Sequence, residues 1–397
     1  MSSEGDTLDM PDTVSLHGDG DKPAVILLGG AENAVACARR FTRAGIETVA
    51  VNRDAAAVLS SRGVIRASTG TEFTRETTTA WLAGDGRRWE GAVVIPLSDH
   101  ALLGLLDDET FARETYRLAT FDSEVALAML DKQTTLELAR EAGIAVPRQW
   151  APPAEGPIPF IDELTYPLIM KPRRNFELAR RTGWKHVHAD SRADVDEHLA
   201  LMRSLPSGFV FNEFVQGPDE LLSSYYAVRS EDGETLLEFT KTVDRRYPTN
   251  QGGATFHRLV DLPETAEAGR SFFEHIGLTG VGNVEFKTDP QTRELKLMEC
   301  NYRLTAATTL VQDAGIDLAG AIYDQALGRA VEPCLAPEWG ATMWYPIRDL
   351  RSFLAAGAGI RPWLERPKRS SYPYWRFDDP GPTAKLARRY VASRFRS

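Results

Sequence analysis

The chain begins, after a polar stretch, with alternating apolar strands and amphipathic helices. The run AVILLGG, starting at Ala24, predicts a buried strand, AENAVACARRFTRAGI has helical spacing, and ETVAVN predicts a second strand. GAVVIPLSDHALLGLL then predicts a further strand and helix. This order is typical of a small parallel α/β domain, which we expect over residues 23–118.

Beyond this domain the pattern changes to two helices and then to antiparallel strands. SEVALAMLDKQTTLELAREAGI predicts a helix interrupted near Asp131 and Lys132 and a second helix ending at Gly143. YPLIMKPRR predicts an apolar strand that contains Lys171. Strands with a hairpin at EDG follow, then a helix over 264–277 and two strands over 281–301. The expected fold class is α/β (α+β).

One of the last strands, LKLMECNYRLT, ends in polar side chains. Strict alternation would place Leu295, Leu297, Glu299 and Asn301 on one face of this strand. A carboxylate in such a row needs a cationic partner or a metal, because burying it alone costs several kcal/mol. If the preceding turn centres near residues 290 and 291, Glu285 lies opposite or diagonal to Glu299.

Two interpretations of these acids remain open on the residues alone. Glu285, Glu299 and Asn301 supply oxygen atoms of the kind that bind Mg²⁺. Alternatively, they form a polar sheet surface in which Glu285 pairs with Lys287 or Lys296.

Composition narrows the class of protein. The 397 residues carry a net charge of −10, which argues against a general nucleic-acid binder. Three widely spaced cysteines predict no disulfide framework and favour a reducing cytoplasm. No apolar run reaches the roughly 20 residues of a transmembrane helix, and the first 22 residues read as a disordered tail without the apolar core of a signal peptide. GGAENA lacks the third glycine of a dinucleotide fingerprint, so NAD binding is weakly supported.

Several short motifs occur together in a specific order, and in that order the chain resembles the ATP-grasp superfamily from about residue 24 to residue 329. The motifs are Lys132, Lys171, NEFVQGPD, Glu285 and MECNYR. The resemblance implies an N-terminal α/β domain (23–118), a lid-containing subdomain (119–206) and a metal-bearing antiparallel subdomain (207–335), with a tail at 1–22 and a C-terminal extension at 336–397.

The resemblance also implies a nucleotide site. Lys132 and Lys171 match the lysines that contact the triphosphate, and Lys171 has a catalytic share in that role. The hinge strand beside the adenine is implied to be Asn212, Glu213, Phe214 and Val215. Asp219 matches the acid that binds the ribose, with Glu220 as the near alternative.

The implied cofactors are ATP and Mg²⁺, with two ions held by Glu285, Glu299 and Asn301. Arg303 is implied to be catalytic, as a cation that stabilises the transferred phosphoryl group. Where many relatives carry a glycine-rich loop, this chain has PRRNFELARRTGWKHVHA. The cations of this loop either close over ATP or form a solvated lid surface; they are Arg173, Arg174, Arg180, Arg181 and Lys185.

Substrate recognition is expected over residues 241–257. Arg245 and Arg246 suit carboxylate binding, although neighbouring strand residues point in opposite directions and one of them can face solvent. Gly252 and Gly253 permit close approach of the backbone. Lys241 belongs to the same set, and His257 either contacts substrate or sits at a sheet edge.

With its long basic loop, the segment FTKTVDRRYPTNQGGATFHRLV and a tail running through WRFDDPGP, the chain resembles the branch of the superfamily that joins amino acids to carboxylates, which includes D-aspartate ligase-like enzymes. This resemblance implies ATP-dependent formation of an amide or peptide bond through an acylphosphate, with small carboxylate and amine substrates. The rivals are an enzyme that activates bicarbonate or a small amino acid, and a non-catalytic ATP-binding regulator. The basic helix AKLARRYVASRFRS either contacts an anionic polymer-linked acceptor or packs Leu386 and Val391 on the body. We expect no nucleic-acid partner and no stable membrane insertion, and a homodimer is compatible with this interpretation.

Overall fold

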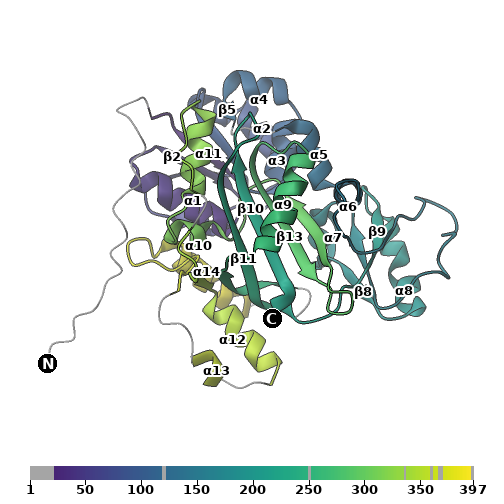
Figure 1. Cartoon of the computed structure of the whole chain (residues 1–397). Coiled ribbons are helices and arrows are strands. Elements are labelled where there is room, and N and C mark those ends of the chain that lie inside the picture. Colours follow the sequence, from purple (N-terminus) through teal and green to yellow (C-terminus); the bar gives the residue numbers. More distant parts are fainter. Residues whose placement is uncertain are drawn as a thin grey trace.

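The computed structural model describes residues 22–118, 122–248, 252–334, 337–357, 361–364 and 370–394. Apart from Lys22, the expected tail lies outside these ranges. The described chain is a mixed α/β structure built on three sheets (Figure 1), which confirms the expected fold class. No helix within these ranges combines the length and apolar character needed to cross a membrane.

The N-terminal sheet is parallel, with strand order β3-β2-β1-β4-β5. A Cβ on Gly29, which has a φ of 71°, would lie 2.5 Å from Ser98 Oγ, so the turn after β1 packs directly on the turn after β4. The elements are β1 (Val25–Leu28), α1 (Glu32–Arg43), β2 (Thr48–Asn52), η1 (Ala57–Ser60), β3 (Val64–Ser68), α2 (Arg75–Ala83), η2 (Asp85–Trp89), β4 (Val93–Pro96), α3 (Asp99–Leu106), α4 (Glu109–Thr115) and β5 (Arg117–Leu118).

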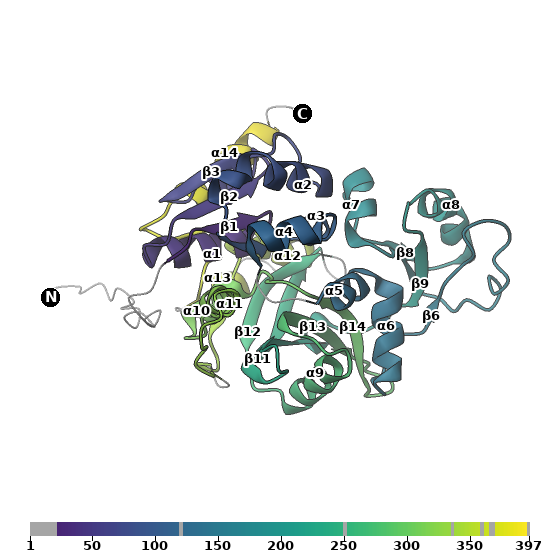
Figure 2. The ribbon, with the colours of Figure 1, turned by 90° about the horizontal axis from the view of Figure 1, so that it is seen from above.

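The lid is a four-stranded antiparallel sheet with strand order β6-β9-β7-β8 and its own apolar core. Figure 2 shows it at one side of the molecule, with α7 facing the N-terminal domain. Helices α5 (Ser123–Leu130) and α6 (Lys132–Glu141) precede it, and Asp131 caps α6 through its side chain. The lid elements are β6 (Gln149–Trp150), β7 (Leu168–Pro172), α7 (Asn175–Thr182), β8 (Val187–Ala189), α8 (Arg192–Arg203) and β9 (Phe209–Glu213).

The central sheet is antiparallel, with strand order β14-β13-β10-β11-β12-β15. Strand β15 belongs to this sheet and β9 to the lid, so sheet pairing crosses the boundaries expected at 335 and 206. The elements are η3 (Asp219–Leu221), β10 (Leu222–Arg229), β11 (Thr235–Tyr247), β12 (Gly253–Leu259), α9 (Pro263–His275), β13 (Gly280–Thr288), β14 (Leu295–Asn301), α10 (Thr308–Asp313), α11 (Leu318–Ala326), β15 (Thr342–Trp344), α12 (Pro346–Ala355), α13 (Arg361–Leu364) and α14 (Gly381–Arg394).

A bulge in β14 corrects the facing expected from strict alternation. Glu285 pairs with Glu299, but the next residue, Phe286, pairs with Leu297, so Met298 is the extra residue on β14. Leu297 therefore shares the apolar face of Phe286, whereas Glu299 lies on the opposite face with Glu285. The predicted single row of leucines ending in an acid is wrong, because one inserted residue reverses the alternation.

The two faces of the central sheet bury different cores. Helix α9 contributes Phe272 and Phe273 to the face that carries Phe286 and Leu297. The opposite face has an apolar part, which α10 and α11 cover, and a polar part on β13 and β14. The polar part of this second face is the candidate site.

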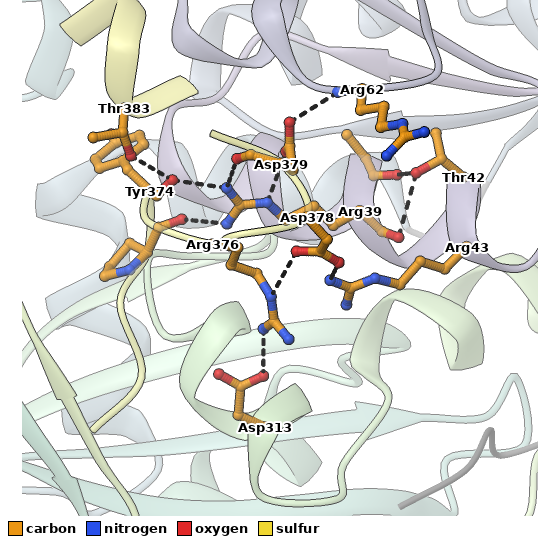
Figure 3. Close-up of polar contacts among 12 residues, drawn as sticks. Arg39, Thr42, Arg43, Arg62, Asp313, Tyr374, Arg376, Asp378, Asp379 and Thr383 are labelled. Carbon is orange, nitrogen blue, oxygen red and sulfur yellow. Dashed lines mark hydrogen bonds and ion pairs between the residues drawn. The ribbon is translucent and has the colours of Figure 1, made fainter. Parts of the chain in front are cut away.

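The C-terminal extension ties the N-terminal domain to the rest of the chain. In a segment that we call the C-terminal latch (373–379), Asp379 accepts a hydrogen bond of 2.9 Å from Arg39 of α1, and both side chains are 6% exposed (Figure 3). Arg39 also donates to the backbone carbonyls of Pro373, Tyr374 and Asp379. Farther on, α14 packs Leu386 against the core but leaves Val391 53% exposed, so the packing expected for Val391 is wrong.

Candidate active site

A row of four polar side chains crosses the central sheet. Strand pairing places Glu299 opposite Glu285, Glu285 opposite Ser224, and Ser224 opposite Lys241. Residues that oppose one another share a face, so the four side chains project from the same side of the sheet. The Lys241 ammonium group donates to Ser224 Oγ at 3.2 Å.

Glu285 is the carboxylate of this row that lacks a close cation. Within the described ranges it makes no hydrogen bond or ion pair, and neither Lys287 nor Lys296 pairs with it. Burial raises the pKa of the Glu285 carboxyl, and the nearby charge of Glu299 raises it further. A cation bound here would oppose both causes of this shift, because it favours the ionised carboxylate.

Glu299 is held by a lysine from another element. Lys132, the first residue of α6, donates to Glu299 Oε2 at 2.8 Å. Burial acts to raise the pKa of Glu299, but Lys132 and Lys171 outweigh it and lower the pKa well below its usual value. Lys171 on β7 makes no hydrogen bond through its ammonium group within the described residues, and burial together with the Lys132 charge lowers its pKa to about 8.

Asn301 and Arg303 extend the row at the end of β14. Arg303 donates to Asn301 Oδ1 at 3.1 Å and to Asp99 Oδ1 at 2.6 Å, and Asp99 opens helix α3. Burial acts to lower the pKa of Arg303, but Asp99 outweighs it and raises the pKa. One pocket is lined by Asp99, Lys132, Glu299, Asn301 and Arg303, among other residues.

The donor set at this position fits Mg²⁺. Two carboxylates from neighbouring strands and one amide oxygen are hard oxygen ligands, and an ion held by so few protein groups keeps water or phosphate as its remaining ligands. Among the described residues, no three His, Cys, Asp or Glu side chains form a metal-binding group. With two carboxylates and one amide oxygen as protein ligands, the site suits an ion whose other ligands come from water or a nucleotide.

The strand implied to line the adenine is held by lysines from the central sheet. Lys287 donates to the carbonyl oxygens of Val215 and Gly217, both at 2.9 Å, and its ammonium group lies 5.9 Å from the centre of the Phe214 ring. Lys296 binds the Glu213 carboxylate at 3.1 Å. Asn212 accepts a hydrogen bond of 3.4 Å from Gln149. The polar side chains of this segment are thus committed to protein partners, and its free backbone groups are left for a base.

The acid matched to the ribose is already ion-paired. Asp219 is buried and accepts from the Arg246 side chain at 2.8 Å and from the Arg246 backbone at 3.0 Å. The alternative, Glu220, is exposed. Arg246, the partner of Asp219, also acts on the pKa values of Glu285 and Lys171. Asp219 is therefore the one of these two acids that we connect with the site.

The middle of the basic segment of the lid forms helix α7, whereas Arg173 and Arg174 precede the helix and Lys185 follows it. Within the part of the chain that the structure describes, three of the five cations of this segment have side-chain partners: Arg173 pairs with Asp131, Arg180 pairs with Glu72, and Arg181 donates to Ser204. Lys185 is exposed, and its charge lowers the pKa of Glu299.

The expected substrate residues separate into two groups. Lys241 and His257 lie on the face of Glu285, as the pairing of β11 with β12 shows. Arg245 instead donates to the fully buried Asp349 at 2.9 Å, because a bulge in β11 turns it towards α12. A Cβ on Gly252 would lie 1.9 Å from the Tyr247 carbonyl oxygen, so only glycine fits there.

Sequence reasoning missed several residues of the site. Asp99 was overlooked, although the polar turn SDH was an available signal, and Lys287 was considered only as a partner of Glu285. His186 lies among Lys171, Lys132 and Lys185; burial and these charges lower its pKa to about 3. Arg348, discussed below, had no signal, because it lies about 90 residues from the segment it approaches.

Comparisons with known proteins agree with this architecture. A family model described as "ATP-grasp in the biosynthetic pathway with Ter operon" matches residues 232–344. No curated protein matches the sequence.

Solved structures match over most of the chain. N5-carboxyaminoimidazole synthetase from Staphylococcus aureus, complexed with ADP, has 16% identity and a TM-score of 0.63, over 88% of this chain and 91% of that one. The biotin carboxylase complex from Campylobacter jejuni has 15% identity and a TM-score of 0.61, over 80% and 74%.

A third structure, the biotin carboxylase domain dimer of the Hydrogenobacter thermophilus 2-oxoglutarate carboxylase with MgADP, ADP and bicarbonate, has 15% identity and a TM-score of 0.60, over 80% and 73%. At these identities the likeness establishes the overall fold, and the fold that the sequence resemblance implied is confirmed.

Proposed function

From the premise that this chain has the ATP-grasp fold, we propose that it is an ATP-dependent carboxylate-amine ligase. The carboxylate of one substrate would attack the γ-phosphorus of ATP, releasing ADP and forming an acylphosphate. The amine of a second substrate would then attack the acyl carbon, and phosphate would leave as the amide bond forms. The amine proton passes to solvent.

The observation that carries this proposal is the Glu299–Glu285 pair and its surroundings. Two facing acids are bordered by Lys132, Lys171 and Lys241, cations that lie close enough to act on their pKa values. This combination suits a triphosphate with its metal ion, since the cations offset phosphate charge while the acids retain the metal. A simple anion site would not need the two acids.

Each residue has a role in this proposal. Glu285, Glu299 and Asn301 would hold Mg²⁺, which neutralises phosphate charge when bound. Lys132 and Lys171 bind the phosphates. Arg303 keeps Asn301 oriented through its 3.1 Å hydrogen bond, and its positive charge faces the transferred phosphoryl group. The backbone of 212–215 receives the adenine, and Asp219 receives the ribose once Arg246 shifts.

The alternative enzyme activity is activation of bicarbonate. It is favoured by the H. thermophilus structure, which was solved with a bicarbonate anion. That activity would use the same phosphate and metal residues and would differ only in the acceptor. Small-molecule substrates, a cytoplasmic location and a homodimer belong to the same proposal, and the dimer is checked by light scattering.

The test is phosphate release from Mg-ATP by purified protein. Amino acids are offered singly and in pairs, and bicarbonate is offered separately. Release that requires a particular pair supports the ligase, and hydroxylamine added to the acid substrate alone should trap a hydroxamate from the acylphosphate. Release with bicarbonate alone supports the alternative.

Glu299→Gln is the control for contaminating phosphatases, because it removes a proposed metal ligand with little change in shape. Turnover should fall by roughly 1,000-fold in this variant. Tight ATP binding with no release from any pool would favour the regulator, and failure to bind ATP would contradict the whole proposal.

A further inference from the structure

A second group of side chains lies near Lys241, at the end of the row of polar side chains that crosses the central sheet. It consists of His257 on β12 and of Tyr345 and Arg348 at the start of α12. The His257 and Tyr345 rings are 6.1 Å apart, and the Arg348 guanidinium lies 4.9 Å from the centre of the Tyr345 ring. Strand pairing puts His257 on the same sheet face as Lys241 and Glu285. The group therefore lies beside Lys241, on the face that carries the acids, with β10 and β11 between His257 and Glu285.

His257 is buried but lacks one expected partner. It is 5% exposed, and its Nδ1 atom has no hydrogen-bond partner among the described residues. A buried polar atom without a partner costs about 1–3 kcal/mol. Burial, with the nearby charges of Lys241 and Arg348, lowers the pKa of His257 well below its usual value. The neutral ring can donate one hydrogen bond without adding a charge.

Arg348 is a cation without an acid. No carboxylate pairs with it in the described part of the chain. Its guanidinium group instead lies over the Tyr345 ring, in a cation–π contact. Its Nη1 atom is 3.1 Å from where a Cβ on Gly253 would lie, so the glycine leaves room for the guanidinium. An arginine fork held in this way matches a carboxylate in bidentate fashion.

Nearby acids do not complete this group. Asp349, the next residue on α12, accepts from Arg245, Thr255 and Trp344. The hydroxyl groups of Tyr345 and Tyr374 donate hydrogen bonds to the Glu32 carboxylate of α1, at 2.9 and 2.8 Å.

We propose that Arg348 and His257 bind the α-carboxylate of a free amino acid, which supplies the attacking amine. This inference rests on the proposed ligase function and specifies its amine substrate. The guanidinium supplies the charge and the neutral imidazole a further donor. The adjacent row on the sheet face then places the amine close to the activated acyl group.

The test is calorimetric titration of the full chain loaded with Mg²⁺ and a non-hydrolysable ATP analogue. The probes are the twenty free L-amino acids, D-aspartate, D-alanine and the α-amides of those that bind. At least one free amino acid should bind, and its α-amide should bind roughly 10- to 100-fold more weakly. Arg348→Gln should weaken binding of the free amino acid by a similar factor, while Arg348→Lys should restore part of it because the charge returns without the fork.

Two controls keep the result specific. Arg351→Gln alters an exposed arginine of the same helix and should leave amino-acid binding unchanged. His257→Gln keeps a donor in place of the ring and should weaken binding less than His257→Leu does. All variants should bind the ATP analogue as the unmodified protein does, which also shows that they are folded.

Three outcomes would overturn the inference: equal binding of acid and α-amide, full binding by Arg348→Gln, or no amino-acid binding by the nucleotide-loaded protein. Each is distinct from failure of the proposed function. A protein that does not bind the ATP analogue contradicts the ligase itself, whereas one that binds the analogue but no amino acid contradicts only the role of Arg348 and His257.

Discussion

The C-terminal latch buries its charged side chains and the polar face of the central sheet partly buries them, and the two regions complete the pairing of those charges to different degrees. In the latch, Arg39 donates to a carboxylate and to three backbone carbonyls, and Asp379 also accepts from the Arg62 backbone. On the sheet face, Glu285 and Lys171 have no such partners within the described ranges. Complete pairing joins parts of the chain, and at the incompletely paired charges we expect a ligand to supply the missing partners.

The largest effect expected from this comparison is on the latch. Asp379→Ala leaves the buried Arg39 without its carboxylate, so we expect the free energy of unfolding to fall by about 3–5 kcal/mol. Urea unfolding followed by tryptophan fluorescence measures it. The matched control is Asp378→Ala, which removes more exposed ion pairs with Arg43 and Arg376 and should lower the free energy of unfolding by less than about 1 kcal/mol. Equal decreases in the free energy of unfolding in the two variants would contradict the structural role of the Arg39–Asp379 pair.

A second prediction separates the two arginines of β11. Arg245→Gln removes the charge facing buried Asp349, so unfolding should become easier by about 1.5–3 kcal/mol, while the KM values for the substrates stay unchanged. Chemical denaturation and steady-state kinetics give the two quantities. A raised KM with an unchanged free energy of unfolding would show that Arg245 binds substrate and would contradict its structural role.

A third prediction concerns the unpaired lysine of the lid. Lys171→Met should weaken ATP binding by roughly 10- to 100-fold, because a charge-assisted contact to phosphate is lost. The free energy of unfolding without ligand should stay the same or rise, because the variant no longer buries an uncompensated charge. Calorimetry with the ATP analogue and urea unfolding test both parts. Lys185→Met, at an exposed position of the same lid, should weaken ATP binding less.

The smallest expected effect is a pH dependence of nucleotide binding. The pKa of Lys171 is lowered to about 8, so its positive charge is present below pH 8 and is lost as the pH rises through that value. Since ATP binding needs the charged form, affinity should fall by a factor approaching ten per pH unit above about pH 8. Titrations from pH 7 to pH 9 measure the slope, and Lys171→Met should flatten it. An unchanged slope in the variant would assign the effect to another group.

Local patterns accounted for much of the fold. The first strands and helices, the break at Asp131, the helix α9 and the β13–β14 hairpin were predicted, because each depends on periodicity or on a capping residue within a few positions. The bulge at Met298 was not, because it has no residue signature and reverses the facing of the leucines.

The site was harder to predict than the fold, because its partners are distant in sequence. Acids and lysines that lie within short motifs, such as Glu299 and Lys171, were identified as candidates from the sequence. The contacts of Arg303 with Asp99 and of Lys287 with the hinge carbonyls join segments about 70 or more residues apart, and no local pattern predicts such contacts. The same distance concealed Arg348.

The most direct test of the account is thermal unfolding of Glu285→Gln and unmodified protein, each with and without Mg-ATP. If the Glu285 charge is unpaired and awaits a cation, the variant without ligand should unfold at the same temperature as the unmodified protein or higher. Mg-ATP should then raise the unfolding temperature of the unmodified protein far more than that of the variant. A variant that is destabilised without ligand, yet gains as much from Mg-ATP, would show that Glu285 is a structural charge and would contradict the account.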